Sequence, residues 1–177
     1  MTTSARQTLV IALAAIGMVI AVGFTTPAAN AGHQNPVLEA DLDGRAEVAA
    51  NDNSRIVGDP NGRGEIYVFG IDGDPSRTTL CYVMTVDGIA ELDLAPSTPP
   101  RMAHIHEGAP GENGPVVASL AWPQDGQSAD CISTDQPGKF FEGVTPADIF
   151  ENPGDYYVNV HNGVYPGGAL RGQLSSR

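Results

Sequence analysis

The density of turn-forming residues constrains the fold of this chain more than any other feature. From residue 36 onward, glycine and proline interrupt the apolar stretches at short intervals, and the 177-residue chain contains 21 Gly and 14 Pro. The stretches between them are rich in β-branched and aromatic residues, which are typical of strands. The expected strands are residues 37–42, 45–50, 64–71, 78–86, 101–107, 115–122, 155–161 and 168–174.

Only one segment after residue 36 predicts a helix. Thr145 can act as its N-cap, Pro146 suits the first helical position, and Asn152-Pro153-Gly154 ends it after about two turns. The last two expected strands would form a hairpin across residues 162–167. Short strands, many turns and one short helix predict an all-β, antiparallel β-sandwich or barrel with Greek-key connections.

Residues 1–31 have the composition of an export signal. Arg6 is their only charged residue, residues 9–24 are uniformly apolar, and residues 29–31 (ANA) are small enough for signal peptidase to recognise. Cleavage after Ala31 would leave residues 32–177 as a single domain that is periplasmic, held in the cell envelope or secreted. The alternative is an uncleaved N-terminal anchor. No comparable apolar run follows, so we expect no transmembrane segment after cleavage.

The predicted mature chain is strongly acidic. The full sequence carries 9 basic and 21 acidic side chains, and removal of Arg6 leaves residues 32–177 with a formal charge of −13. Such a charge repels nucleic acids and anionic lipid headgroups, so we expect neither as a partner. Acidic surfaces also keep exported proteins soluble, and we expect a monomer.

Cys81 and Cys131 are the only cysteines, and both belong to the part that we expect to be exported. In an oxidising compartment such a pair predicts one disulfide, which would close a loop of about 50 residues and stabilise the fold by roughly 4 kcal/mol. A thiol nucleophile or a thiolate metal ligand would need reduced cysteines, which export disfavours. Because both faces of residues 78–86 look covered, we expect Cys81 to point toward an opposite sheet.

Three of the four histidines lie in two similar motifs, HIHEGAPG at residues 104–111 and HNGVYPG at residues 161–167. Alternate residues of a strand share a face, so His104 and His106 can converge on one ion, and His161 is the expected third ligand. An all-imidazole set suits copper or zinc. The competing interpretation is structural, because each imidazole can also hydrogen-bond the backbone of a neighbouring turn without any metal.

Other acidic and imidazole groups are weaker candidates for metal sites. After cleavage His33 would be the second residue, where an amino-terminal imidazole can hold Cu(II). The acidic pairs Asp41/Asp43 and Asp72/Asp74 offer oxygen ligands for calcium but are better explained as turn-forming residues.

Three polar residues near the second histidine motif have structural interpretations. Asn159 and Asn162 flank His161 and would hydrogen-bond at the strand edge and in the turn. Arg171 is either a solvated charge on a strand or a clamp for a carboxylate across the sheet.

Two stretches resemble the CHRD domain, a family named after chordin and found in exported bacterial proteins. They are AHIHEGAPGENGPVV at residues 103–117 and YYVNVHNGVYPGGALRGQL at residues 156–174, and LCYVMTVDGI at residues 80–89 resembles the central strand of the family. The likeness covers about residues 37–174. It implies an immunoglobulin-like β fold in an exported protein that is not an enzyme.

The sequence carries no catalytic motif, since it has no GxSxG elbow, P-loop, dinucleotide fingerprint or HExxH pair. Copper-zinc superoxide dismutase also has a His-x-His strand in a β-sandwich, but its two metals need more histidines than the four in this chain. We therefore expect a non-catalytic interaction or structural module whose partner is an extracytoplasmic macromolecule. The alternative is a copper- or zinc-binding protein that uses His104, His106 and His161.

Overall fold

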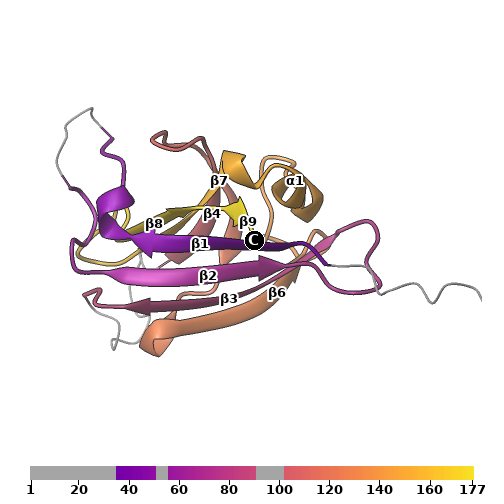
Figure 1. Cartoon of the computed structure of the whole chain (residues 1–177), viewed down its shortest axis with the longest axis horizontal. Coiled ribbons are helices and arrows are strands. Elements are labelled where there is room, and N and C mark those ends of the chain that lie inside the picture. Colours follow the sequence, from indigo (N-terminus) through magenta and orange to yellow (C-terminus); the bar gives the residue numbers. More distant parts are fainter. Residues whose placement is uncertain (1–34, 51–55, 91–101) are drawn as a thin grey trace, which may run out of the picture. The chain divides into compact units, whose positions relative to one another are not determined.

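The computed structural model describes residues 35–50, 56–90 and 102–177, which form a nine-stranded antiparallel sheet with one short α-helix (Figure 1). The predicted export signal at residues 1–31 and His33 lie outside the described residues. The elements are β1 (Val37–Asp43), β2 (Arg63–Phe69), β3 (Thr79–Asp87), β4 (Met102–Glu107), β5 (Val116–Leu120), β6 (Gln127–Ser133), α1 (Pro146–Glu151), β7 (Tyr156–His161), β8 (Leu170–Gln173) and β9 (Ser175–Ser176).

The strands follow the order β5-β4-β7-β8-β1-β2-β3-β6, and β9 pairs with β1. The two ends of this order approach each other, because the chain that leaves β6 runs along β5. Ser119 N donates to Lys139 O at 2.9 Å, and Phe141 N donates to Val117 O at 3.0 Å. The sheet is therefore a nearly closed barrel, which confirms the predicted antiparallel β-sandwich or barrel with one short helix.

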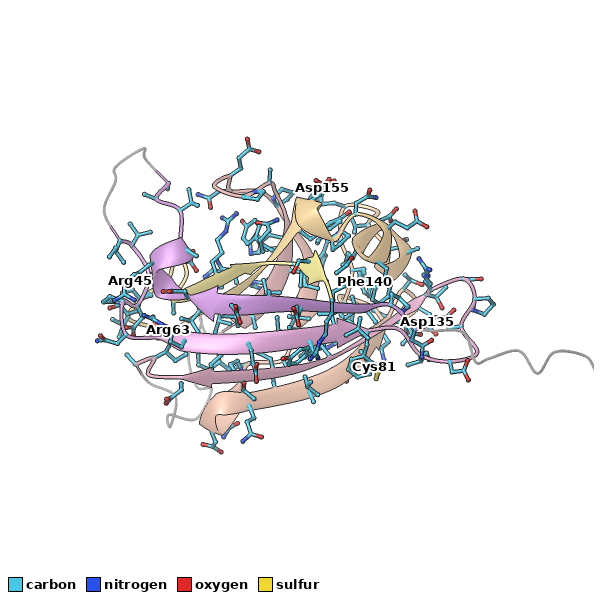
Figure 2. The ribbon with its side chains drawn as sticks, viewed as in Figure 1. Arg45, Arg63, Cys81, Asp135, Phe140 and Asp155 are labelled. Carbon is cyan, nitrogen blue, oxygen red and sulfur yellow. A yellow bond between two sulfur atoms is a disulfide. The ribbon has the colours of Figure 1, made fainter. Side chains whose placement is uncertain are left out.

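The disulfide Cys81–Cys131 is present, but it does not cross the interior as the sequence predicted. The two cysteines face each other on the neighbouring strands β3 and β6. Figure 2 labels Cys81. On β3 the side chains of Tyr82 and Met84 are buried in the core, whereas Val83, on the face of Cys81, is 44% exposed. The prediction that both faces of β3 are covered was wrong. The disulfide links the adjacent strands β3 and β6 on the outer face.

Two segments differ from the expected secondary structure. Residues 45–50 are not a strand: Gly44–Ala46 form a 3₁₀ helix, capped by the side chain of Asp43, and no strand follows before residue 50. Residues 127–133 were not among the expected strands but form β6. Within the part of the chain that the structure describes, β6 pairs with β3 alone. Most of its side chains are exposed, so the sequence shows no apolar alternation.

The helix and the last hairpin agree with the sequence. Thr145 caps α1 and forms a capping box with Asp148, while Ile149 and Phe150 are buried against the barrel. Strands β7 and β8 pair antiparallel across residues 162–169. Among the described residues, no helix is both long and apolar enough to cross a membrane.

Candidate metal centre

His104 and His106 lie on the outer face of β4. Their neighbours Ala103 and Ile105 are buried in the core, so the alternation of a strand turns both histidines to the other face. This face is nevertheless sheltered: His104 is buried and His106 is half-buried. Residues 48–50, which follow β1, line a pocket together with His106.

His161 reaches the same place from the end of β7. In the pairing of β4 with β7, His104 lies directly opposite Asn159, so His161 is a diagonal neighbour of His104. Side chains of diagonal cross-strand neighbours are within reach of one another when they are long or aromatic. Two strands from distant parts of the sequence therefore bring the three histidines of the two motifs together.

The three imidazole rings form a loose triangle. The ring centres are 5.4 Å apart for His104 and His161, 5.7 Å for His104 and His106, and 6.2 Å for His106 and His161. One ligand atom from each histidine lies within 4.8 Å of the other two. This spacing is wider than that of a tetrahedral zinc centre, in which two nitrogens would be about 3.4 Å apart.

Hydrogen bonds to the backbone fix which nitrogen of two of the rings carries a proton. His106 Nδ1 lies 3.0 Å from the carbonyl oxygen of Gly114, and His161 Nδ1 lies 3.1 Å from that of Pro166. A carbonyl oxygen only accepts, so each Nδ1 donates, and in a neutral ring the Nε2 atom keeps its lone pair. The two motifs thus hold their histidines in equivalent ways.

One buried nitrogen of each ring has no hydrogen-bond partner among the described residues. These atoms are Nδ1 of His104 and Nε2 of His106 and His161. Burial and the neighbouring histidines lower the pKa of His104 to about 4, and burial is also the main cause that lowers the pKa of His106 and His161. The lowered pKa values favour the neutral form of all three imidazoles, and a neutral imidazole has one nitrogen that can offer a lone pair.

Tyr157 and Arg171 support the ring of His106. The rings of His106 and Tyr157 are stacked with their centres 4.8 Å apart and an angle of 11° between their planes. Arg171 places its guanidinium carbon 3.5 Å from the centre of the Tyr157 ring, and it donates to Asn113 Oδ1 and to the carbonyl oxygen of Glu112. Arg171 is only 3% exposed, so it is not a solvated charge, and it holds the turn between β4 and β5.

A buried carboxyl lies next to this face. Asn159 Nδ2 is 3.0 Å from both carboxyl oxygens of Glu47. Burial raises the pKa of Glu47 to about 7, although the hydrogen bond from Asn159 and the charge of Arg171 oppose the shift. Gly168 makes room for this carboxyl: its φ is +135°, and a Cβ atom there would lie 2.5 Å from the carboxyl oxygens.

Sequence reasoning missed Glu47 and Tyr157 in this region. It named Asn159 but did not predict that its side chain is buried. The alternation of residues 155–161 contained a signal for two of them, because Tyr157 and Asn159 share the face of His161. Glu47 gave no signal, since it lay in a segment that we expected to be a strand.

The remaining candidates have structural roles. The carboxylates of Asp43, Asp72 and Asp74 accept hydrogen bonds from backbone N–H groups of residues that follow them, as expected for turn-forming aspartates. Asn162 Oδ1 likewise accepts from the backbone of the turn that follows it.

Comparison with known families agrees with the two motifs. The CHRD domain family matches residues 38–174, which is most of the chain. This chain belongs to the CHRD family. The match covers nearly the range expected from the resemblance, and it contains all the described strands except β9 and the first residue of β1. Neither a curated protein nor a solved structure matches this CHRD chain.

Proposed function

We propose that this CHRD protein binds a copper or zinc ion through His104, His106 and His161. The observation that supports this most is the set of three buried ring nitrogens that find no partner among the described residues, in histidines whose ligand atoms lie within 4.8 Å of one another. The structural interpretation accounts for the Nδ1 atoms of His106 and His161, which bond to the backbone. It does not account for the three unpaired nitrogens, and buried polar atoms without partners are rare.

The surroundings of the three histidines are those of a ligand set for a transition metal. Ligand imidazoles usually donate their second N–H to a backbone carbonyl or a carboxylate, as His106 and His161 do here. Copper and zinc both accept imidazole ligands, and the lowered pKa values keep protons from competing at neutral pH. Binding would draw the nitrogens together, from within 4.8 Å of one another to about 3.4 Å.

Elemental analysis of untagged protein tests the proposal. Purified wild-type protein should retain copper or zinc in stoichiometric amount, and His106→Ala should lower the metal affinity at least about 100-fold, since even partners outside the ligand set contribute about 10- to 100-fold. His33→Ala is the matched control: it removes the one histidine outside the site, so any copper that it loses is held at the amino terminus and not by the three histidines. Equal metal content in wild type and His106→Ala would end the proposal.

A second proposal concerns the role of the whole domain. We propose an exported, monomeric and non-catalytic module that contacts an extracytoplasmic macromolecule, with CHRD membership and the lack of catalytic motifs as support.

Export of this module is tested by intact mass spectrometry. Protein recovered from the periplasm or the medium should begin at Gly32, and an intact Met1 would contradict cleavage. Affinity capture from the envelope fraction tests the partner, and recovery of nothing beyond the bait would contradict it.

A further inference from the structure

Asn159 lies beside the histidine cluster formed by His104, His106 and His161, and it adds a fourth buried atom without a hydrogen-bond partner among the described residues. It lies opposite His104 in the pairing of β4 with β7, is only 4% exposed, and lines the same pocket as His106 and His161. Its Oδ1 atom is buried and has no hydrogen-bond partner among the described residues. This oxygen is an acceptor, as are the free Nε2 atoms of His106 and His161.

Glu47 fixes the orientation of the Asn159 amide. Both carboxyl oxygens of Glu47 lie 3.0 Å from Asn159 Nδ2, and an ionised carboxylate can only accept. The NH₂ group must therefore face Glu47 while the carboxylate is ionised, and Oδ1 must face the other way. The cluster thus contains an acceptor that cannot rotate to find a donor elsewhere.

A metal ion alone would satisfy the three nitrogens but would be a poor partner for Asn159. Copper and zinc prefer imidazole and thiolate, whereas amide oxygens suit harder ions such as calcium. A hydrogen-bond donor is the natural partner for Oδ1. Water bound to the metal has such a donor, because its oxygen coordinates the ion and its O–H groups remain free.

We infer that the metal keeps a fourth, exchangeable position, occupied by a water molecule that donates a hydrogen bond to Asn159 Oδ1. The inference rests on the proposed metal site. It assigns the site to the open type, with three protein ligands, rather than to the closed structural type. A pocket of about 270 Å³, lined by residues 48–50, Val57 and Asn159 among others, leaves room for small molecules to replace the water.

Azide binding to the copper-loaded protein tests this inference. Azide coordinates Cu(II) and produces a new absorption band, but it has no hydrogen to donate to Asn159. In Asn159→Leu the bound water loses its acceptor, so azide should displace it more easily and the Kd for azide should fall about 3- to 10-fold. All proteins carry His33→Ala, to remove copper at the amino terminus, and are titrated at pH 8, where Glu47 is ionised.

Two further variants separate the role of Asn159 from general damage. Glu47→Gln leaves Asn159 in place but allows its amide to turn, so the Kd for azide should fall by a smaller factor. Gln127→Leu is the control outside the pocket: Gln127 is exposed at the start of β6 and does not line the pocket, so its Kd should equal that of the parent.

The outcomes are distinct from those of the metal-binding test, because copper content is measured before azide is added. Equal copper in the parent protein and in its His106→Ala form would remove the metal site and this inference with it. Copper binding without any azide band would show that the fourth position does not exchange and would overturn the inference alone. An unchanged Kd in both Asn159→Leu and Glu47→Gln would overturn the role of Asn159.

Discussion

Glu47 shows at the scale of a single residue how burial sets the response to pH. Its pKa is raised from 4.5 to about 7, so between these pH values the folded protein holds a proton that the unfolded chain releases. Stability must therefore fall as the pH rises through this range. A pKa difference of this size corresponds to about 3 kcal/mol.

Glu47→Gln should remove most of this dependence on pH. Urea unfolding of metal-free protein should show that raising the pH from 5 to 8 costs wild type about 3 kcal/mol more than the variant. Glu151→Gln, which alters an exposed carboxyl on α1, should behave as wild type. A wild-type stability that does not decrease between pH 5 and pH 8, relative to Glu47→Gln, would show that Glu47 is not held in its neutral form.

The three clustered histidines could be predicted from the sequence only in part. His104, His106 and His161 could be grouped in advance, because strand alternation and two similar motifs placed them on comparable faces. The free nitrogen of each ring could not be predicted, since it depends on carbonyl groups of Gly114 and Pro166 whose positions the turns determine.

At the scale of elements, α1 depends on its N-cap, Thr145. The helix has six residues, and the Thr145 and Asp148 side chains satisfy backbone N–H groups at its start. Thr145→Ala should lower the free energy of unfolding by about 1 kcal/mol, a typical cost of losing an N-cap. Thr134→Ala, in an exposed turn, should change it by less than about 0.5 kcal/mol. Equal effects of the two substitutions in urea unfolding would contradict the role of the cap.

The sequence predicted some strands and missed others. Strands with one buried face, such as β2 and β3, alternate in burial and were predicted. Strand β6 was missed because most of its side chains are exposed, so backbone pairing with β3 specifies it rather than an apolar pattern.

The disulfide acts on the molecule as a whole. Cys81 and Cys131 are 50 residues apart, and the loop that they close contains β4 and β5, and with them two of the three clustered histidines. The double variant Cys81→Ser/Cys131→Ser should lose about 4 kcal/mol of stability in urea unfolding, because the unfolded chain regains the freedom of that loop. Reduced wild-type protein is the control and should unfold at the same urea concentration as the double variant. A double variant as stable as the oxidised protein would contradict this account.

The sequence by itself determined the features that depend on neighbours a few residues away: the turns, most strands, the capped helix, the two histidine motifs and the CHRD likeness. Tertiary structure decided which face the disulfide occupies, which ring nitrogens remain free, and that Glu47 is buried against Asn159, 112 residues away in the chain. The physical reason is that turn and strand preferences come from local backbone sterics and side-chain alternation. Desolvation and hydrogen-bond partners, in contrast, depend on which distant segments cover a side chain once the barrel has formed.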